Sequence, residues 1–173
     1  MIVVLIGYMA SGKTSLGKKL AEKLNYNFID LDDFIENKEN LSVSEVFKTK
    51  GEIYFRKQES FYLKELLQSK NNIVLAVGGG TPCYSGNMDY ILNAENVNSI
   101  YLKASLATLA NKLIKKKAKR PLIAHIQNKE EMTEFIGKHL FERVQFYNQA
   151  EIHVTIDNKT KDDVVEDIIL ELF

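Results

Sequence analysis

The stretch Gly7-Tyr8-Met9-Ala10-Ser11-Gly12-Lys13-Thr14 decides the fold of this 173-residue chain. It fits the pattern of Gly, four arbitrary residues, Gly, Lys and then Ser or Thr, and it directly follows the apolar run 2–6. Leu16, Leu20 and Leu24 recur after it at helical spacing, so a strand, a loop and a helix are predicted. Backbone N–H groups of such a loop, together with the helix N-terminus, bind a phosphate without desolvating many side-chain charges.

The polar residues of the loop have distinct expected roles. Lys13 supplies a point charge for the β- and γ-phosphates of a nucleotide, and the Thr14 hydroxyl is placed to ligate Mg²⁺. A glycine turn between two core elements is the alternative interpretation, which the flanking strand and helix patterns disfavour. The residues expected to contact nucleotide here are Gly7, Ala10, Ser11, Gly12, Lys13, Thr14 and Ser15.

Composition and charge restrict the class of protein. The chain is 45% hydrophobic, which suffices for a core, and its length is typical of a single domain spanning 1–173. Lys plus Arg and Asp plus Glu both total 23, and this neutral balance argues against nucleic acid as a partner. The single cysteine, Cys83, excludes an internal disulfide and fits a reducing compartment, so we expect a cytoplasmic protein. Because Gly7 interrupts the first apolar run, we expect a buried strand there and neither a signal peptide nor a membrane span.

Apolar runs and helical patterns alternate along the rest of the chain. Strands are expected at 2–6, 28–29, 73–77, 98–102 and 152–156, and helices at 13–24, from Ser42 to before Gly51, at 52–69, before each of the last two strands, and at about 164–172. The second of these helices starts with a capping box, in which Ser42 and Glu45 cap each other's N–H groups. Strands that alternate with helices predict an α/β protein with a parallel sheet and right-handed crossovers.

Carboxylates and glycines follow two of the predicted strands. Asp30 and Asp32 come at the end of the second strand, where α/β sheets bind ligands, although aspartates in such places also serve as helix caps. Gly78-Gly79-Gly80 follows the central strand, and its backbone can approach a ligand directly because it has no side chains. Both features predict a site at the carboxyl ends of the strands, beside the phosphate loop.

A basic run precedes Pro121. Five of the six residues 115–120 are cationic, and Pro121 disfavours helix at Arg120. Such a run is most often a solvated face, but in a phosphate-loop protein it can close over nucleotide phosphates, and we favour this second interpretation. A mobile lid is therefore expected over about 118–128.

Other residues leave two interpretations open or are expected to be structural. Arg56 is spaced to pair with Glu52 or Glu59 on a helix surface, and the pattern alone does not decide between this and a binding role. Four aromatic residues are by pattern more often core than pocket: Phe47, Phe55, Phe61 and Tyr62. The histidines have no metal-ligand spacing and are expected to be structural or surface residues: His125, His139 and His153.

Together, these features resemble the shikimate kinases, small phosphate-loop enzymes of chorismate and aromatic amino-acid biosynthesis. The residues that carry the resemblance follow the order and spacing of that family over nearly the whole chain: the loop 7–14, Phe28-Ile29-Asp30-Leu31-Asp32, Phe55-Arg56, Val77-Gly78-Gly79-Gly80, Arg120-Pro121-Leu122, and Arg143 four residues before Tyr147. The loop alone fits many NTPases, whereas the combination is much more specific.

The resemblance implies a fold and an activity. The fold is a five-stranded parallel sheet in the order 2-3-1-4-5 between helices, with a substrate-binding segment at about 32–60 and the lid at 118–128. The activity is transfer of the γ-phosphoryl group of ATP to the 3-hydroxyl of shikimate, with Mg²⁺. We also expect a monomer.

The resemblance further implies roles for single residues. Asp30, with Thr14, would hold Mg²⁺. Asp32 would bind substrate hydroxyls and orient the attacking oxygen, and the sequence does not decide whether it also takes the proton. Lys13 and Arg120 would neutralise charge on the transferred phosphoryl group, with Arg120 folding over the phosphates from the lid.

The acid substrate would bind in a pocket of its own. Arg56 and Arg143 would clamp its carboxylate, because planar guanidinium groups suit carboxylates better than lysines do. Backbone N–H groups of Gly79 and Gly80 would assist, Gly78 would also border the substrate, and Glu59 would steady Arg56. Phe47 and Phe55 would form apolar walls.

The chain departs from the family pattern in the loop and before the lid. Many members have glycine at the position of Ala10, and alanine here suggests an ordinary backbone conformation. The helix before the lid usually offers an arginine that packs on adenine, and the nearest candidates here are Lys112 and Lys115. Asn158, after the last strand, is a further candidate contact for the nucleotide.

Two rival functions come from different classes. A gluconate kinase-like enzyme would also place arginines around a carboxylate, but Phe55-Arg56 and the three glycines favour shikimate. A nucleotide-binding switch would hydrolyse ATP without regard to small acids, and it would need a large apolar interaction patch.

Overall fold

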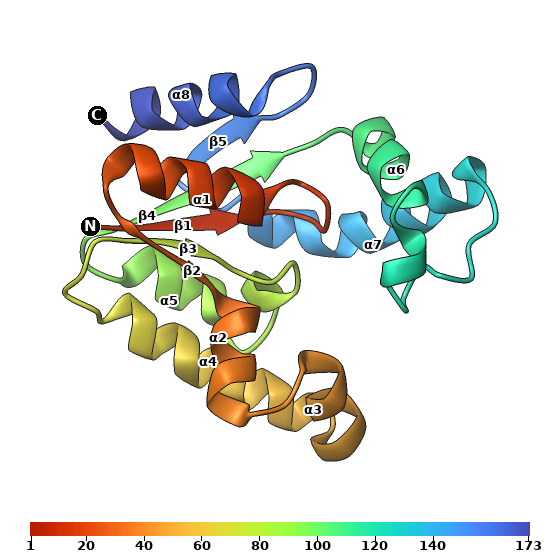
Figure 1. Cartoon of the computed structure of the whole chain (residues 1–173), viewed down its shortest axis with the longest axis horizontal. Coiled ribbons are helices and arrows are strands. Elements are labelled where there is room, and N and C mark those ends of the chain that lie inside the picture. The colour runs from red at the N-terminus through yellow and green to blue at the C-terminus, as the bar shows by residue number, and fades with distance from the viewer.

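In a computed structural model, the chain forms one parallel sheet with helices on both faces (Figure 1). The structure describes residues 1–173, except for the side chain of Lys119. The strands are β1 (Ile2–Ile6), β2 (Asn27–Asp30), β3 (Ile73–Ala76), β4 (Val97–Lys103) and β5 (Ile152–Thr155), and their order across the sheet is β2-β3-β1-β4-β5. All neighbouring strands pair in parallel, so the predicted fold class and strand order are confirmed.

The helices for which a range was predicted lie close to it, but no range was predicted for the helix Leu31–Glu39. The helices are α1 (Lys13–Leu24), α2 (Leu31–Glu39), α3 (Val43–Lys50), α4 (Glu52–Leu67), α5 (Asn87–Asn93), α6 (Leu106–Ile114), α7 (Lys129–Tyr147) and α8 (Lys161–Leu172), with short 3₁₀ turns at Thr81–Cys83 and Lys117–Lys119. The capping box at the start of α3 is present as predicted, with Ser42 accepting from the N–H of Glu45 and Glu45 accepting from that of Ser42. Where bounds were predicted, the strand and helix ends differ from them by at most three residues, the largest difference being at the start of α8.

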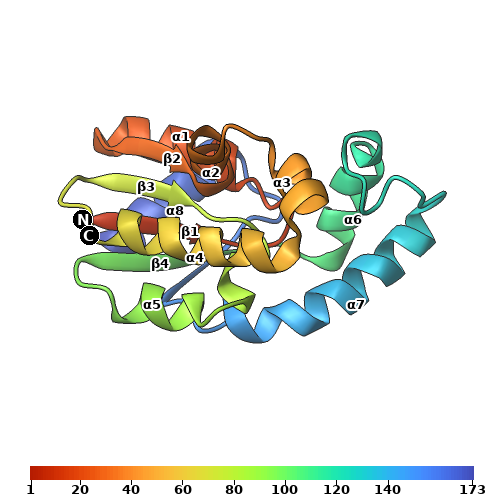
Figure 2. The same ribbon diagram turned by 90° about the horizontal axis from the view of Figure 1, so that it is seen from below.

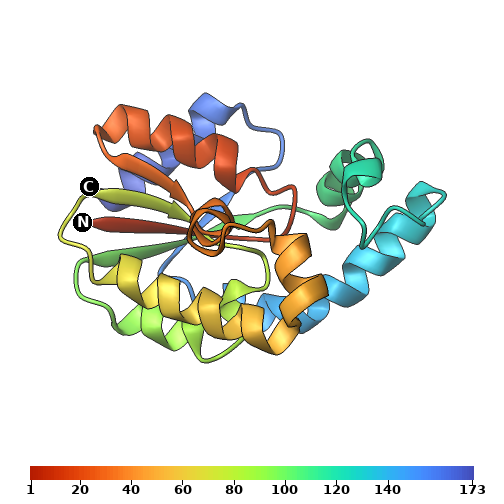
Figure 3. The ribbon, with the colours of Figure 1, turned by 60° about the horizontal axis from the view of Figure 1, so that its bottom comes forward.

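The helices form two layers around the sheet. In Figures 1 and 3, α1 and α8 lie over one face, while α4 and α5 lie over the other. Figure 2 shows both termini at one end of the sheet and α3, α6 and the start of α7 at the opposite end. That opposite end is where the strands point with their carboxyl ends, so the loops expected to bind ligand gather there.

The core is centred on β1. Every residue of this strand is buried, and it pairs with β3 on one side and β4 on the other. Side chains such as Leu20, Leu75 and Ile100 pack around it with no solvent exposure. A strand buried on both faces needs a continuous apolar run, which explains why 2–6 and 73–76 show no alternation of polar residues.

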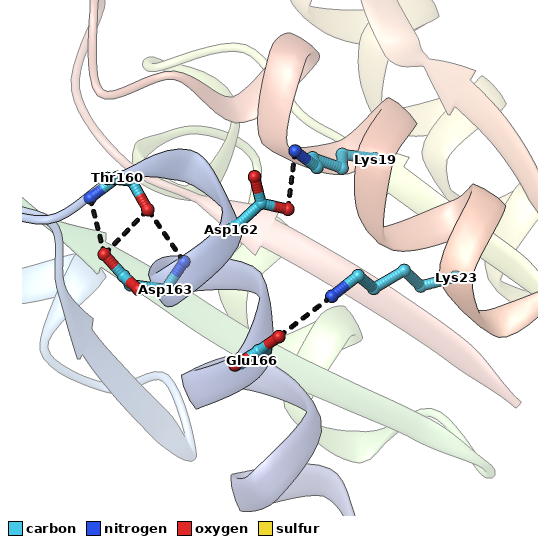
Figure 4. A network of polar contacts seen from close by, with 6 residues as sticks. All are labelled: Lys19, Lys23, Thr160, Asp162, Asp163 and Glu166. Carbon is cyan, nitrogen blue, oxygen red and sulfur yellow. Dashed lines mark hydrogen bonds and ion pairs between the residues drawn. The ribbon is translucent and has the colours of Figure 1, made fainter.

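The C-terminal helix α8 is joined to α1 by surface ion pairs. Figure 4 shows Lys19 paired with Asp162 at 2.6 Å and Lys23 paired with Glu166 at 3.2 Å. A second capping box starts α8, because Thr160 and Asp163 cap each other's N–H groups. The ion pairs are exposed and contribute little stability, so burial of the apolar face of α8 holds it in place.

One structural expectation is wrong. The side chain of Phe61 is 60% exposed, although its aromatic character favoured the core. It lies roughly 200° around α4 from the buried Leu63, on the face turned away from the sheet. None of the described helices is long and apolar enough to cross a membrane.

Candidate active site

The phosphate loop joins the end of β1 to the start of α1. Gly12 precedes the helix with a φ of 91°, a conformation that glycine adopts without strain. Among the described side chains, none caps the first turn of α1, so its N–H groups remain available to an anion. The local fold is therefore the one that the motif predicts.

Lys13 is held at the mouth of the loop. Its Nζ donates to the carbonyl oxygens of Gly7 at 2.6 Å and of Tyr8 at 3.0 Å. Burial lowers the pKa of Lys13 to about 8, while the carboxylates of Asp32 and Asp30 oppose this shift. At neutral pH the side chain is still mostly an ammonium ion, which is the form that binds phosphate.

The expectation of an ordinary backbone at Ala10 is wrong. Ala10 has a φ of 65°, in the left-handed region. A residue with a Cβ costs about 1–2 kcal/mol in this conformation. The course of the phosphate loop fixes the backbone conformation at this position. The methyl group of Ala10 is therefore strained where a glycine would not be.

Thr14 and Asp30 bring oxygen atoms together beside the loop. Thr14 Oγ1 donates to Asp30 Oδ2 at 2.9 Å. Asp30 Oδ1 accepts from the N–H of Asp32 at 3.1 Å, so the same side chain also caps α2. Oxygen donors of this kind suit Mg²⁺, which proteins usually bind through one or two carboxylates and the phosphates of the substrate. The described residues contain no cluster of three or more His, Cys, Asp or Glu side chains that could hold a metal without a substrate.

Asp32 lies in the first turn of α2, facing the glycines that follow β3. Its Oδ1 is 3.4 Å from the point where a Cβ of Gly78 would stand. Burial raises the pKa of Asp32 to about 6, and the negative charges of Asp30 and Glu59 act in the same direction. A carboxyl group with a pKa near neutrality is a better proton acceptor than an ordinary aspartate, and it still ionises at pH 7.

Arg56 is not a surface ion pair. Its Nη1 donates at 2.8 Å to Glu59, whose side chain is only 1% exposed, while Glu52 lies 3.8 Å from Nε. Glu59 also accepts from Thr81 Oγ1 at 2.8 Å, so the carboxylate is held from two sides. The guanidinium lies under the ring of Tyr84, with 3.9 Å from Cζ to the ring centroid. These contacts fix the plane of the Arg56 guanidinium.

The predicted aromatic walls lie next to Arg56. The rings of Phe47 and Phe55 contact each other, with 4.6 Å between centroids. Arg56 Cζ is 5.3 Å from the Phe55 centroid and 6.0 Å from that of Phe47. Phe55 is buried and Phe47 is partly exposed, so the two rings extend from the core towards the surface beside Arg56.

The three glycines after β3 make room for the functional side chains. A Cβ on Gly79 would stand 3.3 Å from Arg143 Nη1 and 3.6 Å from the carbonyl oxygen of Gly7. A Cβ on Gly80 would stand 2.9 Å from Arg56 Nη2. None of these glycines has a positive φ, so space and not backbone conformation explains their presence.

Arg143 reaches the site from α7. It lies beside Gly79, whose carbonyl oxygen accepts from the hydroxyl of Tyr147 at 2.6 Å. A Cβ added to Gly79 would also stand 3.6 Å from the Gly7 carbonyl oxygen, so Arg143 lies near the start of the phosphate loop.

A cleft of about 530 Å³ runs along the phosphate loop. Its lining includes Lys13, Thr14, Asp30 and Asp32 together with Gly78, Gly79, Lys112, Lys116, Arg120 and Lys161. Arg120 is close enough to Lys13 to lower its pKa. Of the two predicted adenine candidates, Lys112 lines the cleft, whereas Lys115 is exposed and does not. Asn158 is likewise exposed and is not among the residues that line the cleft. Lys161, for which the sequence predicted no role, is one of the lining residues.

A second hollow lies at the other end of the sheet. It measures about 600 Å³ and is bordered by Met1, Lys64, Tyr90 and Glu95, among others. It is slightly larger than the cleft at the phosphate loop, but it lies where the strands begin and contains no phosphate-binding loop. The chemistry of the molecule is therefore concentrated at the first cleft.

Sequence reasoning missed several contacts of the site. The hydroxyl of Tyr8 is joined to His139 Nδ1 at 2.8 Å, across 131 residues of sequence. Thr81 supports Glu59, and Tyr84 covers Arg56. Only the four-residue spacing of His139, Arg143 and Tyr147 gave a signal, since it places the three on one helix face.

The chain matches known proteins over nearly its whole length. The model of the shikimate kinase family matches residues 9–173. A shikimate kinase of Flavobacterium johnsoniae is 48% identical over 96% of this chain and 96% of the relative. One of Flavobacterium psychrophilum is 46% identical over 99% of this chain and 98% of the relative.

Solved structures agree with the sequence matches. The shikimate kinase of Bacteroides thetaiotaomicron superposes with a TM-score of 0.89 at 33% identity, covering 99% of this chain and 98% of that one. The shikimate kinase of Acinetobacter baumannii in complex with shikimate has a TM-score of 0.84 at 28% identity, covering 99% and 92%. A gluconokinase of Sinorhizobium meliloti, covering 98% and 90%, has a TM-score of 0.56 at 16% identity, which shows a shared fold alone. With the family model and close relatives in agreement, this chain belongs to the shikimate kinase family.

Proposed function

We propose that this chain transfers the γ-phosphoryl group of ATP to the 3-hydroxyl of shikimate, with the two substrates meeting at Asp32. One observation supports adjoining sites for the nucleotide and the acid. A Cβ added to Gly79 would stand 3.3 Å from Arg143 Nη1 and 3.6 Å from the Gly7 carbonyl oxygen, so Arg143 and the phosphate loop both border this one glycine. An acid bound by the arginines is then next to a phosphate bound by the loop.

The nucleotide side supplies positive charge around the phosphates. The loop 7–12 and the first turn of α1 offer N–H groups, and Lys13 and Arg120 offer side-chain cations. Thr14 and Asp30 are oxygen donors that would hold Mg²⁺ together with the phosphates, and the ion supplies further neutralisation of phosphate charge when bound. Phosphoryl transfer needs this neutralisation more than it needs covalent help from the protein.

The acid side supplies orientation. Arg56 and Arg143 would each donate to the substrate carboxylate, which fixes one end of the molecule. Asp32 would accept from a hydroxyl at the other end and direct that oxygen at the γ-phosphorus. Its pKa of about 6 also allows it to take the proton as the new bond forms.

We further propose that residues 118–128 close over the nucleotide. The segment carries Arg120 to the cleft, and Lys117, which directly precedes it, donates to the carbonyl oxygen of Ile126 near its end. If the segment closes on nucleotide, limited proteolysis within 118–128 slows when ATP is added. Equal cleavage rates with and without ATP would contradict closure. The chain is expected to act as a monomer, which light scattering in solution tests directly.

Release of ADP in the presence of a panel of acceptors tests the proposed function. We expect shikimate to raise the rate far above that without acceptor, and gluconate and nucleoside monophosphates to leave it unchanged. Stimulation by gluconate alone would favour the rival metabolite kinase, and a rate indifferent to every acceptor would favour a switch.

Two variants with matched change of charge test the acid pocket. Arg56→Ala is expected to raise the shikimate KM strongly and to leave the ATP KM unchanged. Lys57→Ala removes an exposed cation from the next position of α4 and serves as the control. A normal shikimate KM for Arg56→Ala would refute the clamp.

A further inference from the structure

One face of α7 carries four side chains at intervals of four residues, and only one of them has a role in the proposed function. The four are Phe135, His139, Arg143 and Tyr147. Residues four apart lie above one another on a helix, so the set forms one stripe. Arg143 is flanked on this stripe by two residues that hydrogen-bond other parts of the site.

On one side of Arg143, the stripe is joined to the phosphate loop. The Tyr8 hydroxyl and His139 Nδ1 are 2.8 Å apart, and the two rings meet edge to face with 5.5 Å between centroids. The ring of Phe135 packs on the same imidazole, with 5.6 Å between the ring centroids. Tyr8 itself is only 1% exposed, so its hydroxyl has exchanged water for this one partner.

Both groups of this pair are neutral at physiological pH. Burial raises the pKa of Tyr8 to about 12. Burial also lowers the pKa of His139, and the neighbouring positive charge of Arg143 lowers it further. The pair is therefore an ordinary hydrogen bond between uncharged groups, with a defined length and direction.

On the other side of Arg143, the stripe is joined to the glycine turn. The hydroxyl of Tyr147 donates to the Gly79 carbonyl oxygen at 2.6 Å, and the side chain of Tyr147 is fully buried. One helix turn separates Arg143 from each attachment. The arginine therefore stands between a bond to the nucleotide half of the site and a bond to the acid half.

We propose that His139 is a positioning residue, which through its bond to Tyr8 fixes Arg143 relative to the phosphate loop. The proposal rests on the proposed function, because it concerns the arginine that would bind the acid. Because α7 begins directly after the segment 118–128, the bond between Tyr8 and His139 would hold α7 in place when that segment moves. Arg143 would then keep its position. A merely space-filling residue at 139 would not need a polar atom aimed at the phosphate loop.

A double-mutant cycle tests this proposal. Tyr8→Phe removes the hydroxyl and keeps the ring, and His139→Leu removes the imidazole and keeps an apolar side chain against Phe135. A net hydrogen bond of ordinary strength predicts that each single variant raises the shikimate KM about two- to tenfold. The double variant is expected to show the same rise as a single one, because either change alone breaks the bond.

Two further variants separate positioning from stability. His139→Asn keeps a side-chain amide that can donate or accept towards Tyr8, so it is expected to retain most of the wild-type shikimate affinity. Tyr26→Phe removes a half-buried hydroxyl that bonds Met1 far from the cleft, and it is expected to leave the shikimate KM unchanged. Calorimetric binding of shikimate gives the same comparison without turnover.

The outcomes distinguish this inference from the proposed function. If the wild-type protein does not phosphorylate shikimate, the proposed function fails. If it does, but Tyr8→Phe and His139→Leu bind shikimate normally or their effects multiply in the double variant, the positioning role is refuted. A lowered melting temperature with unchanged shikimate affinity would likewise assign the bond to stability alone. If His139→Leu does not fold, the other two variants still test the proposal: Tyr8→Phe is expected to raise the shikimate KM, and His139→Asn is expected to keep it near the wild-type value.

Discussion

Replacing Gly80 by alanine tests whether the arginine pocket depends on the absence of side chains after β3. The new Cβ would stand 2.9 Å from Nη2 of Arg56, closer than real Cβ atoms approach, and 3.1 Å from Nη1, which is tighter than most real contacts. The backbone itself accepts alanine, since Gly80 has a φ of −85°. The guanidinium must therefore move by several tenths of an ångström, and the 2.8 Å bond from Arg56 to Glu59 is the contact that this movement strains.

The size of the effect follows from the hydrogen bond that the displaced Arg56 guanidinium would make to the substrate carboxylate. A hydrogen bond to a charged group contributes about 1.5–3 kcal/mol, and losing half of the upper value corresponds to about a tenfold change in an equilibrium constant. We therefore expect Gly80→Ala to raise the shikimate KM about tenfold. The ATP KM and the melting temperature are expected to stay near those of the wild type, because the displaced group is the end of a flexible side chain.

Steady-state kinetics at saturating ATP measure this prediction. Gly137→Ala is the matched control, since an added Cβ there would lie 3.6 Å from its nearest neighbour, Leu106 Cδ2. Because Gly137 lies within α7, alanine is expected to stabilise the protein by up to ~1 kcal/mol and to leave both KM values unchanged. A wild-type shikimate KM for Gly80→Ala, or an equal rise in the ATP KM, would refute the reasoning.

Three further predictions concern single residues. The pKa of Asp32 is raised in the folded state, so its ionisation removes stability as the pH rises from about 4 to about 6. In urea unfolding, Asp32→Asn is therefore expected to be more stable than the wild type by about 3 kcal/mol at pH 7 and equal to it at pH 4. A difference that does not change with pH would contradict this. Ala10→Gly relieves a left-handed alanine but loosens the unfolded chain, so a net gain of up to ~1 kcal/mol is expected, and a loss would show that the methyl group makes a favourable contact. Arg120→Ala is expected to lower kcat by about 10³- to 10⁵-fold, while the exposed Lys115→Ala serves as its control; comparable effects of the two would remove Arg120 from the transfer step.

The strands and the phosphate loop could be predicted because local sequence determines them, whereas the strand order followed only from the resemblance to the shikimate kinases. The apolar run 2–6 has no polar residue to turn towards water, and the pattern of 7–14 occurs with one backbone geometry. The same geometry explains the failure at Ala10. Its conformation is imposed by the loop around it, so the residue type gave no guide to the φ of 65°.

Contacts between distant segments could not be predicted. The bond from Tyr8 to His139 depends on where α7 crosses the phosphate loop, which no local pattern specifies. The exposed position of Phe61 depends on the rotation of α4 about its axis, and its weak apolar periodicity left that rotation uncertain. The role of Arg56 was undecided for a related reason: helical spacing showed the pairing with Glu59 but not that this pair is buried.

Phosphorus NMR of the reaction mixture tests the central claim most directly, because it follows the phosphorus atom itself and does not rely on ADP release. With ATP, Mg²⁺ and shikimate, the γ-phosphorus signal of ATP is expected to be replaced by that of a phosphate monoester coupled to the proton at carbon 3 of shikimate, in equal amount to the ADP formed. Appearance of inorganic phosphate alone, at the same rate with and without shikimate, would contradict the account.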